Sequence, residues 1–334
     1  MLVAVGPLSA SATQPADRHL VLVDARTGTV DKSFPDLVVS ALVADGHGGW
    51  FASGVSYGAL VHLNAGARVD QRWHAQLPNG ADARRLVRVG GRLYVSLARQ
   101  IAAIDAATGK RLWLSERFSP VKLSGSVTLN ALAADKNTVF VGGDFSRVGA
   151  FARQSVVALH ARDGHLLAWR MPQVMKPPYA VDVLTVAASR LYVGGVTSPV
   201  AVDVRTGKLL DWAPSFTADE TTAIAVVGRT VVVGGTFGFA AYDARTTRPK
   251  TWTRHLGGSA TVLAASGTTL YLGANLRSSF GAQSGDRNNL GAVDVATGRF
   301  LDWGPNLARF VTVGSIAPSG GKVLVAGSFT ASVG

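Results

Sequence analysis

Cysteine is absent from this chain of 334 residues, which excludes disulfides, thiolate nucleophiles and cysteine metal sites. Glutamate is nearly absent, because Glu116 and Glu220 are the only two. No uninterrupted apolar run reaches the roughly 18 residues of a membrane-spanning helix, so we expect no membrane span. Charged residues make up only 16% of the chain and hydrophobic residues 47%, which is typical of a well-packed globular protein.

Acidic residues are outnumbered, since 21 aspartates and glutamates face 33 lysines and arginines, giving a net charge of +12. The arginines are spread along the chain, and the nearest thing to a basic patch is Arg84, Arg85, Arg88 and Arg92. A patch of this kind would suit an anionic polymer, whereas scattered arginines solubilise a surface. We interpret them as a solubilising surface. The sequence also shows no aromatic stacking platform, so we expect no nucleic-acid partner.

What the chain does contain is a repeat, and its clearest copy is 93–113, LYVSLARQIAAIDAATGKRLW. This copy reads as a strand, a loop, a second strand, a tight turn from Asp105 to Gly109, and a third strand that carries Trp113. The turn pattern Asp-x-x-Thr-Gly occurs four times, beginning at Asp24, Asp105, Asp203 and Asp294. The aspartate accepts hydrogen bonds from nearby backbone groups, and the glycine supplies a positive φ.

Degenerate turns at 64–66, 160–164 and 243–247 bring the number of copies to seven. An aromatic residue follows each turn, at intervals of 39, 40, 56, 43, 40 and 51 residues. A large apolar ring at a fixed place in every repeat is suited to packing one repeat against the next. We therefore assign a structural role in packing between repeats to Phe34, Trp73, Trp113, Trp169, Trp212, Trp252 and Trp303.

Two apolar segments precede each turn, and the second often ends in small residues, as in 139–143, VFVGG. Four short strands in each unit of about 40 to 45 residues are typical of a β-propeller blade. The segment 103–113 resembles the tryptophan-docking motif of propeller repeats of the pyrroloquinoline-quinone (PQQ) type. The segment 141–159 is similar to the bacterial delta-60 type repeat. Together the two resemblances cover nearly the whole chain, and they imply a bacterial β-propeller with a WD40-like architecture.

The expected fold class is therefore all-β: a seven-bladed β-propeller of four-stranded antiparallel blades, closed by a composite blade from both termini. In that blade a strand near Val311 to Ala317 would join strands from residues 1–34, which removes exposed sheet edges. The repeat spans the chain, so we expect residues 1–334 to form one domain. A spare copy of the second strand at 2–6 indicates either a displaced terminal strand or a fragment of a longer exported protein.

Ligand sites of propellers usually lie where the loops from the fourth strand to the next first strand meet those between the second and third strands. Loops longer than the repeat requires are 114–126, 144–153, 171–180 and 275–289, and long loops carry function more often than tight ones. Their charged and aromatic side chains are our candidate ligand-binding residues: Glu116, Arg117, Lys122, Asp144, Arg147, Lys176, Tyr179, Arg277, Asp286 and Arg287.

No catalytic spacing is recognisable, so we assign no catalytic residue. The seven histidines form no close pair on one element, which predicts surface or turn positions and no metal site. The glycine-rich segment 45–49, DGHGG, reads as a tight turn between the first and second strands of a blade. The PQQ-like resemblance implies the possibility of a quinone cofactor with calcium. We predict no cofactor, because such enzymes are larger and carry a carboxylate and amide calcium set that this sequence does not show.

The sequence thus predicts a non-catalytic propeller scaffold that binds a protein or a surface glycan. The alternative is an enzyme, quinoprotein-like or carbohydrate-active, with its site on the loop-rich face. A cluster of carboxylates at the channel mouth would favour the enzyme, and a mainly apolar or arginine-lined channel would favour binding. The resemblance also implies a protein that is exported or associated with the bacterial cell envelope.

Overall fold

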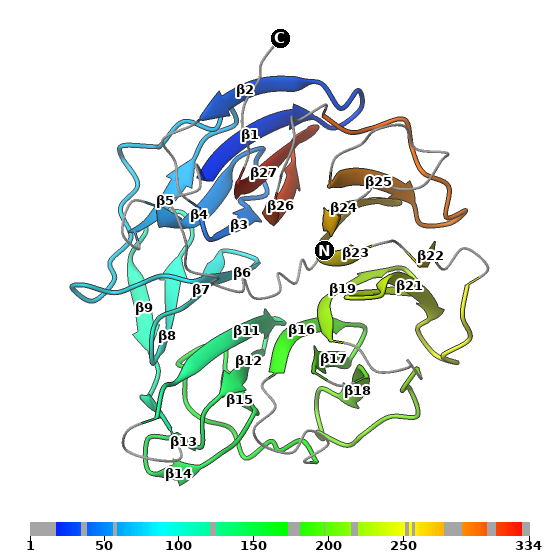
Figure 1. The fold of residues 1–334 in the computed structure, drawn as a ribbon. Helices are drawn as coiled ribbons and strands as arrows, with labels where there is room; N and C mark the ends of the chain where they lie inside the picture. Colours follow the sequence, from blue (N-terminus) through cyan, green and yellow to red (C-terminus); the bar gives the residue numbers. More distant parts are fainter. Residues whose placement is uncertain are drawn as a thin grey trace.

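The computed structural model describes residues 18–34, 39–55, 59–120, 125–172, 181–196, 198–214, 220–250, 254–255, 258–276, 289–305 and 312–328. Every regular element among them is a β-strand, which confirms the all-β prediction. Figure 1 shows these strands as sheets arranged radially around a central opening. The predicted spare strand at 2–6 lies outside the described residues.

Seven sheets form the blades of this ring, consistent with the predicted seven, and each is antiparallel. Blade 1 contains β3 (Ala41–Ala44), β4 (Trp50–Val55) and β5 (Ala59–Leu63). Blade 2 contains β6 (Arg85–Val89), β7 (Arg92–Ser96), β8 (Ile101–Asp105) and β9 (Arg111–Leu114). Blade 3 contains β11 (Thr128–Ala134), β12 (Thr138–Asp144) and β15 (Val156–His160). Blade 4 contains β16 (Val181–Ala187), β17 (Arg190–Gly195) and β18 (Val200–Asp203). Blade 5 contains β19 (Thr221–Val227), β20 (Thr230–Gly235), β21 (Gly238–Asp243) and β22 (Arg254–His255). Blade 6 contains β23 (Gly258–Ser266), β24 (Thr269–Leu276) and β25 (Leu290–Asp294).

Blade 7 is the predicted composite of the two ends of the chain. Its strands, from outside to inside, are β2 (Val30–Phe34), β1 (Arg18–Asp24), β27 (Lys322–Ser328) and β26 (Thr312–Ser319). The register places Val21 opposite Val325, which confirms the predicted pairing of the N-terminal strands with the sheet that contains 323–326. Contacts between β26 and β3 then join blade 7 to blade 1 and close the ring.

The fourth, outermost strand is shorter than predicted. Within the described residues a fourth strand is present in blades 2, 5 and 7. In blades 1, 3, 4 and 6 it is reduced to an isolated bridge, such as Leu63 to Val69 in blade 1 and Val293 to Phe300 in blade 6. An additional sheet of β10 (Phe118–Ser119), β13 (Arg147–Val148) and β14 (Phe151–Ala152) extends blade 3 and uses the predicted delta-60-like segment.

The Asp-x-x-Thr-Gly turns are closed by one carboxylate oxygen. In blade 2, Oδ1 of Asp105 accepts hydrogen bonds from the backbone N–H of Thr108 at 2.9 Å and from its hydroxyl at 2.7 Å. The same pair of bonds forms at Asp24, Asp203, Asp243 and Asp294. Bonds from the threonine lower the pKa of Asp105, as expected for a carboxylate that accepts several donors.

Each described tryptophan of the repeat then contacts the turn of the following blade, as the repeat predicts. Trp113 of blade 2 donates its indole N–H to the carbonyl of Ala161 in blade 3 at 3.1 Å. Trp73 donates to Ala106, Trp212 to Asp243, and Trp303 to Asp24 across the seam into blade 7. We call this the docking contact. Trp252 and the side chain of Phe34 lie outside the described residues.

Trp169 is the exception, because its buried Nε1 has no hydrogen-bond partner in the described part of the chain. Its ring is still only 9% exposed and packs edge-on against Phe140. Trp113 is 8% exposed, so the two indoles differ in hydrogen bonding and not in burial. A buried donor without a partner costs about 1–3 kcal/mol.

We therefore expect Trp113→Phe to destabilise the fold more than Trp169→Phe, by at least about 1 kcal/mol. The first change removes a hydrogen bond, whereas the second removes an unsatisfied donor; both leave a similar void. Urea unfolding of the two variants and the wild type measures the difference. Equal losses of unfolding free energy would show that the indole hydrogen bond contributes nothing to the docking contact.

The turn glycines are required by the preceding blade as well as by the turn. Gly109 has φ +74°, and a Cβ placed on it would lie 2.1 Å from the carbonyl oxygen of His74. At the equivalent Gly164 a Cβ would lie 2.5 Å from the ring of Trp113. Gly228, in the hairpin between β19 and β20, also has a positive φ of +56°, but no atom lies within 4 Å of its Cβ position.

This contrast separates backbone strain from steric exclusion. We expect Gly228→Ala to cost about 1 kcal/mol, the price of an alanine in the left-handed region. Gly109→Ala adds the clash with blade 1, which costs about 1–3 kcal/mol more. Urea denaturation followed by tryptophan fluorescence gives both values. Equal costs would mean that the blades separate easily enough to admit the extra methyl group.

Candidate functional site

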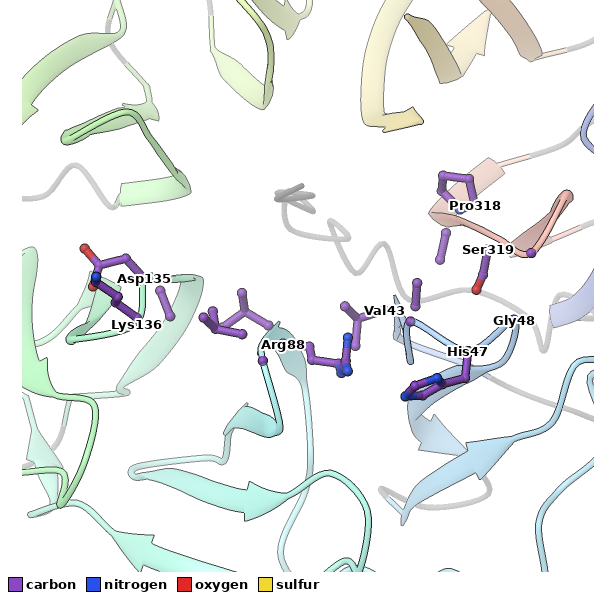
Figure 2. Close-up of a pocket in the computed structure, with 16 residues that line it drawn as sticks. Val43, His47, Gly48, Arg88, Asp135, Lys136, Pro318 and Ser319 are labelled. Carbon is purple, nitrogen blue, oxygen red and sulfur yellow. The ribbon is translucent and has the colours of Figure 1, made fainter. Parts of the chain in front are cut away.

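A cavity of about 990 Å³ lies on the inner side of the ring (Figure 2). It lies where the inner hairpins of blades 7, 1, 2 and 3 meet, and Figure 2 shows its lining. The lining segments are 43–44, 46–48, 87–90, 134–136 and 317–320. We call this cavity the mouth pocket. It is formed by the ends of first strands and their turns into second strands, and these turns share one face of the ring.

The walls of the mouth pocket are mostly aliphatic or glycine. Val43 belongs to β3, and Val87 and Val89 belong to β6. Pro318 and Gly320 close the side formed by blade 7. These residues end the innermost strands, where small and β-branched side chains suit crowded neighbours.

The charges of the pocket are mainly basic. Arg88, Lys136 and His47 come from three different blades, and Figure 2 shows them spaced along one side of the opening. Asp135 is the one acidic residue of the lining, and its Oδ1 accepts the backbone N–H groups of Asn137 and Thr138 within its own turn. A pair of carboxylates therefore does not line this pocket.

Arg88 extends from β6 toward the turn that contains His47 and Gly48 (Figure 2). A Cβ placed on Gly46 would lie 2.7 Å from Nη1 and 3.2 Å from Nη2 of Arg88, so the guanidinium lies against this glycine. The Nε of Arg88 is buried and has no hydrogen-bond partner among the residues that the structure describes. No ion pair joins Arg88 to another described residue.

The glycine-rich turn at 45–49 joins β3 to β4 as predicted. The first residue of this turn, Asp45, belongs to a row of three hydrogen-bonded side chains: an aspartate, a histidine and a second aspartate. Oδ1 of Asp45 accepts the N–H groups of His47 and Gly49, and its Oδ2 lies 3.0 Å from Nε2 of His62. The other ring nitrogen of His62 lies 3.1 Å from Asp70. The imidazole of His62 therefore bridges the carboxylates of Asp45 and Asp70.

His62 corrects the prediction that the histidines occupy surfaces or turns. It lies in β5, is partly buried, and packs against the rings of Phe51 and Trp73. Although burial opposes ionisation, hydrogen bonds from His62 and the turn lower the pKa of Asp45. Asp70 also borders a smaller cavity of about 500 Å³ beside Trp73 and His74.

The four arginines of the supposed basic patch diverge, which corrects their interpretation as a common solubilising surface. Arg84 is exposed and pairs with Asp82 at 2.7 Å. Arg85 donates from Nε to the carbonyl of Asn130 at 2.7 Å, and Arg92 donates to the carbonyl of Ala161. Arg88 enters the mouth pocket. Three of the four thus have particular positions between blades.

The predicted ligand-binding residues lie elsewhere. Glu116 and Arg117 border β10 and Arg147 lies in β13, so the additional sheet of blade 3 brings these three together on an exposed edge. Asp144 is exposed at the end of β12. None of the four lines either cavity described above. The other six lie outside the described residues: Lys122, Lys176, Tyr179, Arg277, Asp286 and Arg287.

Sequence reasoning missed the mouth pocket because it favoured the opposite face of the ring. The available signal was Arg88, a cation between Val87 and Val89 in a first strand, shortly before the tight turn Gly90-Gly91. The glycine-rich turn at 45–49 was recognised only as a turn.

At the other end of the inner strands, polar side chains link one blade to the next. The Nδ2 of Asn130 in β11 donates to Asp182 in β16 at 2.9 Å, next to the bond from Arg85. In blade 5 the hydroxyl of Thr222, which also sits at a β-bulge of the inner strand, donates to the carbonyl of Ala260 in blade 6 at 2.8 Å. These bonds connect neighbouring blades where the inner strands begin.

Asp182 occupies the bulge position of blade 4 and is 6% exposed. Burial raises its pKa to about 6, assisted by the nearby charge of Glu220 and opposed by Asn130 and Arg85. A folded-state pKa above the unfolded value of about 3.9 means that the folded chain binds this proton more tightly. The resulting stability is therefore present at low pH and is lost as the pH rises from about 4 through about 6.

We expect Asp182→Asn to stabilise the fold above about pH 6 and to change little near pH 4, since the amide keeps the bond with Asn130 and carries no charge. Thermal unfolding of the variant and the wild type across this range gives the difference at each pH. A difference that does not vary with pH would show that Asp182 does not titrate in the fold.

In the described part of the chain, no three histidine, aspartate or glutamate side chains are grouped so that they could hold a metal ion. The same part contains no helix long and apolar enough to cross a membrane.

Known structures share the propeller fold of this chain. BamB from Moraxella catarrhalis is 18% identical, with a TM-score of 0.54, over 97% of this chain and 95% of that one. The computationally designed Ika8 protein is 15% identical, with a TM-score of 0.57, over 88% and 94%. The extracellular domain of a putative hybrid two-component system from B. thetaiotaomicron is 13% identical, with a TM-score of 0.59; the match covers 88% of this chain but 37% of that one.

No curated protein matches the sequence. A family model described as outer membrane protein assembly factor BamB matches it at residues 16–212 and again at 62–303. These matches extend over far more than half of the chain and contain the repeated turns and their tryptophans. The chain therefore belongs to this PQQ-like family of bacterial β-propeller repeat proteins.

Proposed function

We propose that this chain is a non-catalytic propeller that binds a polypeptide partner in the mouth pocket. The observation that supports the proposal most directly is the chemistry of the lining. Aliphatic and glycine walls surround Arg88, and Asp135, the acid of the lining, accepts hydrogen bonds from its own turn. A mostly apolar cavity with few polar groups is typical of a binding site.

The family supports a protein as the partner, because its description names an assembly factor of the outer membrane. The same description, with the extracellular domain among the similar structures, supports a location in the cell envelope or outside the cell. The predicted delta-60 repeat and a single domain over 1–334 remain parts of this proposal, and a surface glycan is the alternative partner. No cofactor is included in it.

An enzyme on the opposite face would depend on Asp182 and Glu220, which influence each other electrostatically. Glycoside hydrolysis uses two carboxyl groups that flank the scissile bond. Asp182 instead is buried and accepts a hydrogen bond from Asn130 of the neighbouring blade. This bond favours a structural role for Asp182.

The experiment that tests the proposal fills the mouth pocket. Ser319 lines it at the end of β26, and Ser319→Trp places an indole in the opening. Ser266 ends β23 at the equivalent hairpin position of blade 6. It lies opposite Thr269, and Ser319 lies opposite Lys322 in the same way. Ser266 does not line the pocket. Ser266→Trp is therefore a matched control.

Binding of fluorescent synthetic peptides of neutral, acidic and basic composition is measured by anisotropy. We expect the wild type and Ser266→Trp to bind a subset of the peptides, and Ser319→Trp to lose at least about tenfold in affinity, or 1.4 kcal/mol. Thermal shifts with PQQ plus calcium, oligosaccharides and nucleic acid are recorded in parallel. A shift with PQQ plus calcium, or peptide binding that Ser319→Trp leaves intact, would contradict the proposal.

A further inference from the structure

We infer that the mouth pocket recognises a carboxylate of an acidic polypeptide segment through the guanidinium of Arg88. This inference rests on the proposed function, because it names the chemistry of the partner that the pocket binds. The observation behind it is a cation that is directed into a cavity and has no counter-charge. Three steps connect that observation to an acidic ligand.

The first step is the state of Arg88. Its side chain lies along Gly46, its Nε is buried, and no hydrogen bond or ion pair joins its guanidinium to any residue that the structure describes. A guanidinium has five N–H donors and no acceptor. A buried polar group without a partner is costly unless something else satisfies it. A ligand with acceptor oxygens would do so.

The second step concerns the acids close by, which are occupied. Asp45 precedes Gly46, but its two oxygens accept from His47, Gly49 and His62. Oδ1 of Asp135 closes the turn at the far side of the pocket. Neither carboxylate neutralises Arg88, so the positive charge of the pocket is available to a ligand.

The third step is the setting of that charge. Lys136 and His47 line the pocket on either side of Arg88 (Figure 2), and the surfaces between them are Val43, Val87 and Pro318. Apolar walls exclude water and strengthen the attraction between a guanidinium and a carboxylate. Arginine also matches a carboxylate with two parallel hydrogen bonds, which a lysine does not.

The size and the walls of the cavity select a polypeptide. A single inorganic anion would leave most of the 990 Å³ empty. A peptide segment can place a carboxylate on Arg88 and apolar side chains against the valines and Pro318. The carboxylate can belong to an aspartate, a glutamate or the end of a chain, and the experiment separates these sources.

The test compares three forms of a peptide that binds the wild type. The first contains aspartate and glutamate, the second replaces them with asparagine and glutamine, and the third is the acidic form with an amidated C-terminus. Each is measured by fluorescence anisotropy against the wild type, Arg88→Gln and Arg88→Lys. Arg111→Gln is the matched control, because Arg111 is exposed on the outer strand β9, away from the mouth pocket, and its loss changes the net charge equally.

We expect Arg88→Gln to weaken binding of the acidic peptide by about tenfold or more, the loss of a charged hydrogen-bonded pair. Arg88→Lys should retain part of the affinity, and Arg111→Gln all of it. The peptide with asparagine and glutamine should bind the wild type weakly, and Arg88→Gln should change its affinity little. If amidation of the C-terminus weakens binding as strongly as Arg88→Gln does, the contact is made by a terminal carboxylate, which supports the same inference.

Two results would overturn the inference and leave the proposed function intact. One is equal binding of all three peptide forms by the wild type, and the other is an effect of Arg88→Gln on the acidic peptide no larger than that of Arg111→Gln. If nucleic acid displaces the acidic peptide, and added salt abolishes this displacement, the pocket is instead a site for polyanions in general. If no peptide binds at all, the proposed function itself fails. A thermal melt of each variant confirms that the fold is retained, and Arg88→Lys provides the answer if Arg88→Gln does not fold.

Discussion

The docking contact between an indole and the aspartate turn of the next blade is the interaction on which the ring depends. A single blade cannot cover both of its faces, so each needs its neighbours. The turn glycine allows the approach, since a Cβ at Gly109 would collide with blade 1, and the indole N–H then bonds the turn carbonyl. Ala161 shows how much converges there: its carbonyl accepts from Trp113, Tyr94 and Arg92 of the preceding blade.

The fold could be predicted because the features that determine it recur locally. Asp105, Thr108 and Gly109 lie within five residues of one another, and the same turn returns in blade after blade. Seven copies of a strand-and-turn pattern define a ring, and the surplus at both ends predicted a composite blade. The register of β1 against β27 confirms that deduction. The outer strands were overestimated because a single backbone bridge, such as Leu63 to Val69, leaves the same sequence pattern as a full strand.

The mouth pocket could not be predicted in the same way, because it belongs to no repeat. Arg88 meets Gly46 only after blades 1 and 2 have packed together, and 42 positions separate them in the sequence. The row of Asp45, His62 and Asp70 likewise joins a turn, a strand and a loop. A search for repeats identifies residues that are alike from blade to blade. Arg88 and His62 differ from the residues at the equivalent positions of other blades. Departures from the repeat, such as the cation Arg88 between two valines of a first strand, are where function is best sought in such chains.

The composite blade has a consequence for the order of folding. Blades 1 to 6 are each formed from one continuous stretch of the chain, but β1 pairs with a strand about 300 positions later. During synthesis β1 and β2 emerge first and have no inner neighbour until β27 follows. Contacts of such long range form late and slowly, because the intervening chain must first be ordered. The hairpin of β1 and β2 thus has an open sheet edge until β27 pairs with it, and Trp303 reaches its acceptor at Asp24 only when blades 6 and 7 come together.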